Sequence, residues 1–221
     1  MPANTLYQTL VKENIIGSQG CIKFTLNDIG VDIQDVSVVG NILQEWLGHF
    51  MQDKNIYYRE KSNTQEFPDF LLDPDNSNTH NFLEVKAFTG SPNFDVANFS
   101  AYARSLRENA FRLDAKYLIF KYSPSEKGII IDNIWLKNVW EICSPSARSP
   151  IKIQWKQGVP FNIRPATWHS QRAKYKPFES RKEFIESLSH VIGMAGIDQS
   201  IQKNWLKVVS ENYQFHTGQE L

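Results

Sequence analysis

Apolar side chains recur every three or four positions in several parts of the chain, which is the spacing of an amphipathic helix. Residues 37–50 show this pattern, and they begin with Ser37, a residue type favoured at the N-cap. Residues 96–113 show it most clearly. Two further helices are predicted at about 179–194 and 198–213, so helices are expected both before the central strands and at the end of the chain.

Short segments rich in β-branched and aromatic residues predict strands between these helices. The predicted strands span residues 55–60, 67–72, 81–88, 116–122 and 128–135. From residue 55 the order is strand, strand, strand, helix, strand, strand, which is typical of a mixed sheet in an α/β protein. Residues 151–155 and 159–164 are predicted to form a further small hairpin.

The strands at 67–72 and 81–88 are separated almost entirely by turn-forming residues, so they are predicted to pair as a hairpin. Because side chains alternate along a strand, Glu84 and Lys86 share one side of the second strand with two phenylalanines. The opposite side is apolar and carries Leu83, Val85 and Ala87. Two charged side chains are therefore expected next to each other on one face.

Asp69, Glu84 and Lys86 are the candidate catalytic residues. Asp69 follows a proline, Glu84 comes fifteen positions later on the paired strand, and Lys86 lies two residues further on. Asp75 is a rival for the aspartate, since it also follows a proline before Glu84. It lies in a turn pattern, whereas Asp69 is embedded in a predicted strand, and we therefore prefer Asp69.

This arrangement resembles the PD-(D/E)XK nuclease superfamily and, within it, the type II restriction endonucleases. The resemblance covers roughly residues 37–122, while the C-terminal part matches only in general character. It implies an α/β fold with a restriction-endonuclease-like mixed central β-sheet flanked by helices, and with C-terminal helices. We expect one domain over residues 1–221, with its core at about 37–135 and a basic segment and helical tail at 148–221.

The resemblance also implies a hydrolase that cleaves phosphodiester bonds in double-stranded DNA with Mg²⁺. A divalent cation neutralises charge on the phosphate and activates a water molecule. Magnesium prefers oxygen ligands and keeps several waters, so Asp69 and Glu84 would be enough to hold it. Lys86 would position the attacking water or stabilise charge in the transition state. Whether it also deprotonates the water stays open.

Two further expectations come from the resemblance alone. Many members carry an acidic residue on the helix that precedes the core strands, and Glu45 occupies that position beside the apolar stripe of residues 37–50. Glu45 is therefore a third metal-ligand candidate, with an ordinary solvated glutamate as the alternative. Type II enzymes usually act as homodimers, because a two-fold protein matches a two-fold DNA site.

The composition is that of a folded protein, with 41% hydrophobic and 13% aromatic residues. No stretch approaches the roughly 20 apolar residues of a membrane-spanning helix, and we expect a cytoplasmic protein. Cys21 and Cys143 have no CxxC spacing, so neither a zinc site nor a disulfide framework is indicated, and two buried thiols are expected.

The formal net charge is zero, but its distribution is uneven. Residues 148–182 contain nine Lys or Arg and one acidic residue, Glu179, a distribution typical of a local phosphate-binding surface, with a solvated basic face without a partner as the alternative that charge alone leaves open. Polar groups that could reach DNA lie there and in residues 93–107. The DNA-binding candidates are Asn98, Tyr102, Arg104, Asn162, Arg164, Thr167 and His169.

Two alternative functions remain open from the sequence. A repair or recombination nuclease would read DNA structure instead of sequence, and would cut branched or damaged DNA. A non-enzymatic DNA-binding module would use the basic segment and the terminal helices, with the acidic pair incidental. Cleavage of plain plasmid DNA into discrete fragments would indicate a restriction enzyme and not a repair nuclease. Magnesium-dependent cleavage of any DNA would exclude the non-enzymatic binding module.

Overall fold

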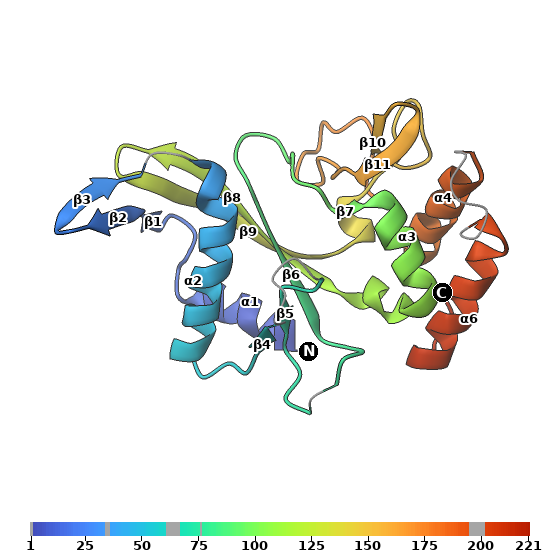
Figure 1. The fold of residues 1–221 in the computed structure, drawn as a ribbon, viewed down its shortest axis with the longest axis horizontal. Coiled ribbons are helices and arrows are strands. Elements are labelled where there is room, and N and C mark those ends of the chain that lie inside the picture. The colour runs from blue at the N-terminus through green and yellow to red at the C-terminus, as the bar shows by residue number, and fades with distance from the viewer. Residues whose placement is uncertain (1, 34–35, 61–66, 76, 195–201) are drawn as a thin grey trace. The chain divides into compact units, whose positions relative to one another are not determined.

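The computed structural model describes residues 2–33, 36–60, 67–75, 77–194 and 202–221 (Figure 1). The chain forms two compact units. The first consists of Met1–Ser91 with Lys116–Lys137, and the second of Pro92–Ala115 with Asn138–Leu221. Neither unit is a continuous segment of the chain. The single domain expected over residues 1–221 stays a prediction.

A mixed sheet forms the centre of the first unit, with the strand order β1-β9-β8-β6-β5-β4. Its strands are β1 (Gln19–Gly20), β4 (Arg59–Glu60), β5 (Phe70–Leu71), β6 (Phe82–Phe88), β8 (Lys116–Ser125) and β9 (Gly128–Asn138). β6 and β8 are parallel, whereas β1–β9, β4–β5 and β5–β6 are antiparallel pairs. The mixed character of the sheet therefore agrees with the order of elements predicted from the sequence.

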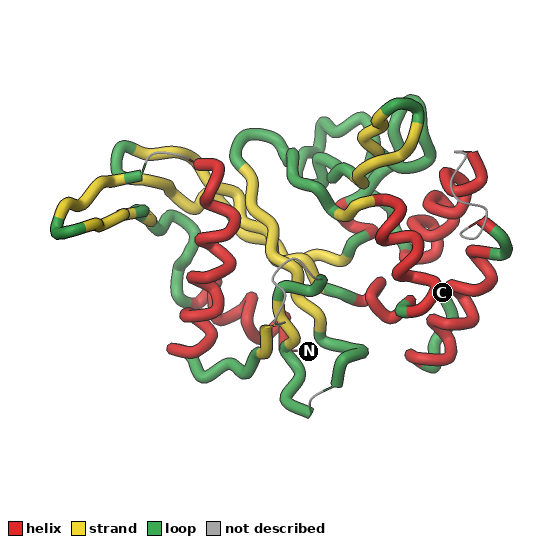
Figure 2. Tube along the Cα trace, in the orientation of Figure 1, coloured by secondary structure: helices red, strands yellow, loops and turns green. Residues whose placement is uncertain are grey.

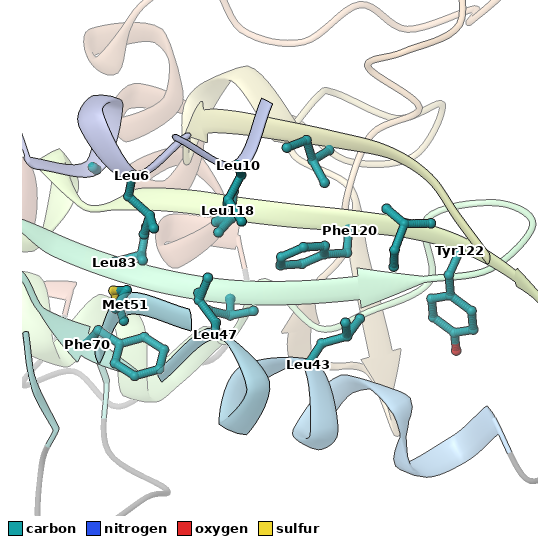
Figure 3. Packing of buried hydrophobic residues seen from close by; sticks show 14 of the residues in the cluster. Leu6, Leu10, Leu43, Leu47, Met51, Phe70, Leu83, Leu118, Phe120 and Tyr122 are labelled. Carbon is teal, nitrogen blue, oxygen red and sulfur yellow. The ribbon is translucent and has the colours of Figure 1, made fainter. Parts of the chain in front are cut away.

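Helices α1 (Pro2–Lys12) and α2 (Val39–Asp53) pack on the apolar side of this sheet. Figure 3 shows Leu6 and Leu10 of α1 and Leu43, Leu47 and Met51 of α2 gathered with side chains of β6 and β8. The three α2 residues are four positions apart, so they lie on one helix face. The predicted alternation of β6 is correct, because Leu83 and Val85 belong to this core.

A separate two-stranded hairpin belongs to the first unit and consists of β2 (Lys23–Leu26) and β3 (Ile29–Asp32). Asn27 and Asp28 join the strands, and both have positive φ. Two such residues form a type I′ turn, which matches the twist of a hairpin. In Figure 2 the hairpin extends beyond α2.

The second unit combines a small sheet with helices. The sheet is antiparallel with the order β10-β11-β7, made of β10 (Ile153–Lys156), β11 (Val159–Ile163) and β7 (Ala97–Asn98). The helical elements are α3 (Phe99–Glu108), η2 (Ala110–Asp114), η3 (Trp140–Ile142), α4 (Arg181–Met194) and α6 (Trp205–Thr217). Trp205 is buried and its indole N–H donates to the carbonyl oxygen of Ala103 at 2.7 Å, which joins α6 to α3.

Several element boundaries differ from those predicted. Helix α2 begins at Val39, after the 3-10 turn η1 (Val36–Val38), and Val38 is its N-cap in place of Ser37. The predicted helix over 96–113 is divided, because α3 ends before Asn109 and η2 follows. The predicted strands at 55–60 and 67–72 shorten to β4 and β5, two residues each.

Other elements and side chains were not predicted correctly. α1 and the strands β1, β2, β3 and β7 were absent from the predicted set, and the residues of β7 had been predicted as the start of the helix over 96–113. Of the two cysteines, Cys143 is buried as expected, but Cys21 is exposed because it lies next to the projecting hairpin. The start of the helix predicted at 198–213 lies outside the described residues.

Within the described part of the chain, no helix combines the length and the apolar character needed to cross a membrane.

Candidate active site

Asp69 lies immediately before β5 and is joined to β6 by a hydrogen bond. Phe70, the next residue, pairs with Leu83 in the antiparallel register of β5 and β6. The backbone N–H of Val85 donates to Asp69 Oδ2 at 2.7 Å. This bond holds the Asp69 carboxylate beside the strand that carries Glu84 and Lys86, as the predicted hairpin required.

Glu84 and Lys86 lie on the side of β6 opposite the α1 and α2 core. Lys86 Nζ donates to Glu84 Oε1 at 2.8 Å, which is a charge-assisted hydrogen bond. The Glu84 residue is only 8% exposed. The structure therefore brings together all three residues that were predicted from the sequence.

The second carboxylate oxygen of Glu84 carries the clearest sign of a ligand. Glu84 Oε2 is buried, and no described residue of the chain forms a hydrogen bond with it. A buried charged oxygen without a partner is costly, and each such case needs an explanation. A hard cation between Glu84 and Asp69 would satisfy this oxygen, since carboxylate oxygens are the ligands that Mg²⁺ prefers.

The ionisation of Asp69 also indicates that the two carboxylates lie close together. The pKa of Asp69 is raised to about 7, chiefly because the carboxyl is buried and secondly because of the negative charge of Glu84. The Val85 N–H and the Lys86 ammonium act in the opposite direction. A bound cation would relieve the repulsion between the carboxylates and favour the ionised form of Asp69.

No group of three or more His, Cys, Asp or Glu side chains gathers at a metal position among the residues that the structure describes. Two protein carboxylates are nevertheless sufficient for Mg²⁺, which completes its coordination with waters and substrate oxygens. Glu45 is exposed on α2, and its role as a third ligand stays a prediction.

The rival aspartate Asp75 lies in the turn between β5 and β6 and is exposed, as its sequence pattern indicated. The carboxylate that organises this turn is Asp73, which sequence reasoning did not single out. Asp73 is almost fully buried, and its two oxygens accept from the backbone N–H groups of Asp75 and Ser77, each at 3.0 Å. An aspartate that begins a turn often bonds in this way, so the sequence did contain a signal.

His80 completes the organisation of the same turn. Its Nε2 lies 2.9 Å from Asp73 Oδ2, and its Nδ1 lies 2.9 Å from the Ser77 hydroxyl. The turn that connects Asp69 to Glu84 is therefore held by a buried carboxylate and a histidine.

The DNA-binding candidates all lie in the second unit. Asn98 is exposed at the start of α3, where its Oδ1 accepts from Ala101 N–H at 3.0 Å and caps the helix. Its Nδ2 donates to the carbonyl oxygen of Phe161 at 3.2 Å. Asn162 is buried and pairs with Asn98 in the register of β11 and β7. The two candidate segments, distant in the sequence, thus lie side by side.

The remaining candidates differ in their accessibility. Arg164 forms an ion pair with Asp95 and donates to the carbonyl oxygen of Asn93, which ties the two segments together again. Tyr102 is buried in the second unit, and burial raises the pKa of its hydroxyl. Arg104 and His169 are exposed, and Thr167 is half-buried. Contact of any of these residues with DNA stays a prediction.

Comparison with known proteins identifies the family. The model of the NgoBV restriction endonuclease family matches residues 1–221. The type II restriction enzyme NlaIV of Neisseria lactamica is 33% identical over 226 aligned residues, covering 100% of this chain and 93% of that protein. The type II restriction enzyme NgoBV of Neisseria gonorrhoeae is 33% identical over 146 residues, covering 64% of this chain and 82% of that protein.

A solved structure supports the same relationship. The NlaIV restriction endonuclease matches with a TM-score of 0.93 and 32% identity, and the match covers 100% of this chain and 92% of that one. The expected restriction-endonuclease-like α/β fold is therefore confirmed, as is the expected resemblance to type II restriction enzymes. The chain belongs to the NgoBV restriction endonuclease family.

Proposed function

We propose that this protein is a Mg²⁺-dependent type II restriction endonuclease that hydrolyses phosphodiester bonds at specific sequences in double-stranded DNA. The observation that carries the proposal is the unpaired, buried Oε2 of Glu84 next to the raised-pKa carboxylate of Asp69. Both relatives named above are type II restriction enzymes, which supports DNA as the substrate. The order of Asp69, Glu84 and Lys86 supports placing the site in the PD-(D/E)XK class.

In the proposed mechanism, Asp69 and Glu84 hold the metal and Lys86 acts on the water. When bound, Mg²⁺ neutralises charge on the phosphate and lowers the pKa of a coordinated water. The Val85 N–H keeps Asp69 Oδ2 oriented, which leaves the other Asp69 oxygen for the metal. Glu84 would contribute Oε2, the oxygen that has no hydrogen-bond partner among the described residues.

Lys86 has a position that suits a water-orienting role. Its ammonium has three hydrogens, and Glu84 Oε1 accepts one of them at 2.8 Å. A second can hold the attacking water or a phosphate oxygen, where the positive charge stabilises the negative charge that develops in the transition state. Glu84, which would hold the metal through Oε2, thus also fixes the Lys86 ammonium through Oε1.

We further propose that the paired segments of the second unit contact DNA, and that the enzyme acts as a homodimer. Asn98, Arg104 and His169 are the exposed members of the candidate set, and each carries a donor suited to phosphates or bases. A two-fold dimer suits a two-fold DNA site, with one strand cut by each subunit. The cytoplasmic location expected from the sequence stays a prediction.

The decisive experiment is digestion of plasmid and phage DNA by the purified protein, with Mg²⁺ or with EDTA, resolved on agarose. We expect discrete fragments with Mg²⁺ and intact DNA with EDTA. Asp69→Ala, Glu84→Gln and Lys86→Ala should each lower the rate by about 10³-fold or more, since each removes a group that acts on the reacting phosphate. Asp75→Ala is the matched control, because Asp75 is an exposed acidic residue of the neighbouring turn.

Binding and substrate choice complete the test. In EDTA, Asp69→Ala should bind DNA as well as the parent protein or better in a gel shift, because it removes a negative charge near phosphates. Full cleavage by Asp69→Ala or Lys86→Ala would refute the assigned site. Cleavage restricted to branched or damaged DNA would replace the restriction function with a repair function, and DNA binding without any cleavage would indicate a binding module.

A further inference from the structure

The β2–β3 hairpin has an apolar face that no described residue of its own unit covers. Phe24 pairs with Val31 and Leu26 with Ile29 across the two strands. These four side chains share one side of the hairpin and are 55%, 51%, 63% and 70% exposed, respectively. A two-stranded hairpin is barely stable in water without a packed face, so an apolar face of this kind indicates a partner.

A hollow with apolar walls lies in the same unit, immediately before the hairpin in the chain. It has a volume of about 170 Å³. Its walls come from the segment around β1, from α2, and from β8 and β9, and the described residues that form them include Ile42, Trp46 and Phe120 and no Asp, Glu, Lys or Arg. A cavity of about 150 Å³ with apolar walls accepts benzene, so this hollow suits one aromatic ring.

We propose that two copies of the chain associate by exchanging these hairpins, with Phe24 of each copy inserted into the hollow of the other. Phe24 is the one aromatic side chain on the apolar face of the hairpin. A two-fold interface requires a self-complementary patch, and a projecting ring beside a ring-sized hollow meets that requirement. The inference rests on the proposed homodimer and names its surface.

Charge favours a second copy over nucleic acid or a membrane surface. The hairpin segment, residues 21–33, contains one basic residue, Lys23, and two acidic residues, Asp28 and Asp32. Its net charge is therefore negative, and phosphates or anionic lipids would be repelled. The described residues that form the walls of the hollow are uncharged and mostly apolar, so an apolar group that enters it displaces water from little polar surface.

The size of the patch is also suitable for a dimer. About half or more of each of the four apolar side chains is exposed, on the order of 400 Å² in all. Exchange buries this face and the rim of the hollow on both chains, including Ile42 and Trp46, which are 36% and 37% exposed. The total is on the order of 550 Å² per partner, close to the lower limit of the roughly 600–1,000 Å² per partner that specific interfaces bury.

The test is sedimentation velocity of the full chain without DNA or metal, which makes it independent of the proposed chemistry. We expect the parent protein to be a dimer at micromolar concentration. Phe24→Asp should make it monomeric, and Phe24→Ala should weaken the dimer about tenfold or more. Ile42→Asp, in the wall of the hollow, should have the same effect as Phe24→Asp. Thr25→Asp is the matched control, because it introduces the same charge on the opposite face of the hairpin and should leave the dimer intact.

The possible outcomes distinguish an incorrect dimer surface from the absence of a homodimer. A dimeric parent protein that stays dimeric with Phe24→Asp would overturn the proposed surface while leaving the homodimer in place. A monomeric parent protein would overturn both. Far-ultraviolet circular dichroism and thermal unfolding should be unchanged in Phe24→Asp, because the side chain is exposed within its own subunit. If Phe24→Asp is monomeric because it does not fold, Phe24→Ser would be measured in its place. A folded and dimeric Phe24→Ser would contradict the proposed dimer surface.

Discussion

At the scale of single residues, the raised pKa of Asp69 leads to a direct test of how close its carboxylate lies to Glu84. Glu84→Gln removes the neighbouring negative charge, so the pKa of Asp69 should fall from about 7 towards its ordinary value near 3.8. It should not reach that value, because burial is the larger cause and remains. Carboxyl ¹³C chemical shifts, recorded against pH in EDTA, would measure the change.

The matched control for this titration is Glu45→Gln, which makes the same chemical change at an exposed position on α2. The pKa of Asp69 should not change in that variant. An equal fall in both variants would mean that the two carboxylates are not specifically coupled. An unchanged pKa in Glu84→Gln would contradict the geometry of the site.

The same pKa makes the stability of the metal-free protein depend on pH. The folded state holds the Asp69 proton more tightly than the unfolded state, so this stabilisation is complete below pH 3.8 and is lost as pH rises through about 7. The asparagine side chain of Asp69→Asn is neutral at every pH, so this variant does not lose this stability as pH rises. In EDTA at pH 8, this variant should be more stable than the parent by about 2 kcal/mol, a value reduced for partial solvent screening.

Urea unfolding at pH 5 and pH 8 would measure this difference. The advantage of Asp69→Asn should be clearly larger at pH 8, and a saturating divalent cation should reverse it, because the cation stabilises only the parent carboxylate. An advantage that does not change with pH would show that Asp69 titrates near its ordinary pKa.

At the scale of elements, Asn98 offers a way to separate helix capping from DNA contact. Asn98→Ala should destabilise the protein by about 1 kcal/mol, because the cap of α3 is lost. Asn98→Asp should keep the cap, since aspartate is an equally good N-cap residue. If Asn98 also faces DNA, Asn98→Asp should still cleave about tenfold more slowly, because it places a negative charge near phosphates.

Thermal unfolding and cleavage rates of the two variants would be measured side by side. Parent-like cleavage by Asn98→Asp would limit Asn98 to its structural role. Loss of stability in both variants would instead assign the effect to the Nδ2 bond to Phe161, which aspartate cannot make.

Helices and strands were predictable from the sequence where the spacing of their apolar residues matches the face that is buried in the structure. β6 was predicted almost to the residue because one side packs on α1 and α2, so its alternation is enforced by the core. The division of the helix predicted over 96–113 was not predictable, because Ala110 N–H bonds to Asn212, about a hundred residues away. The β2–β3 hairpin was missed although its Asn27–Asp28 turn is a recognisable local signal.

At the scale of the whole molecule, the candidate site was predictable and the accessibility of the DNA-binding candidates was not. Asp69 and Glu84 are linked by a hairpin, so a local pairing rule brings them together. The candidates near Asn98 and Asn162 were placed in two separate regions, and only the β7–β11 pairing shows that these regions are neighbours. The burial of Tyr102 depends on packing within the second unit, including its contact with Phe184, which no short sequence pattern reports.

Each unit is formed by two separate segments of the chain. We therefore predict that no truncation of the chain gives either unit as an independently folded protein. Because β6 and β8 are parallel, their connection must cross over, and residues 92–115 of the second unit lie in that connection. A fragment that ends at Lys137 retains α3 but loses α6, the helix that covers Ala103 through Trp205. Its apolar α3 face would be exposed to water.

We therefore expect the fragment of residues 1–137 to bind a hydrophobic dye strongly and to unfold without a cooperative transition, in contrast to the full chain. Substituting lysine for Leu106, a fully buried residue of α3, should reduce dye binding by the fragment but should destabilise the full chain. Cooperative unfolding of the unmodified fragment with no dye binding would show that the first unit tolerates residues 92–115 as an unsupported loop, and that the two units are energetically separable.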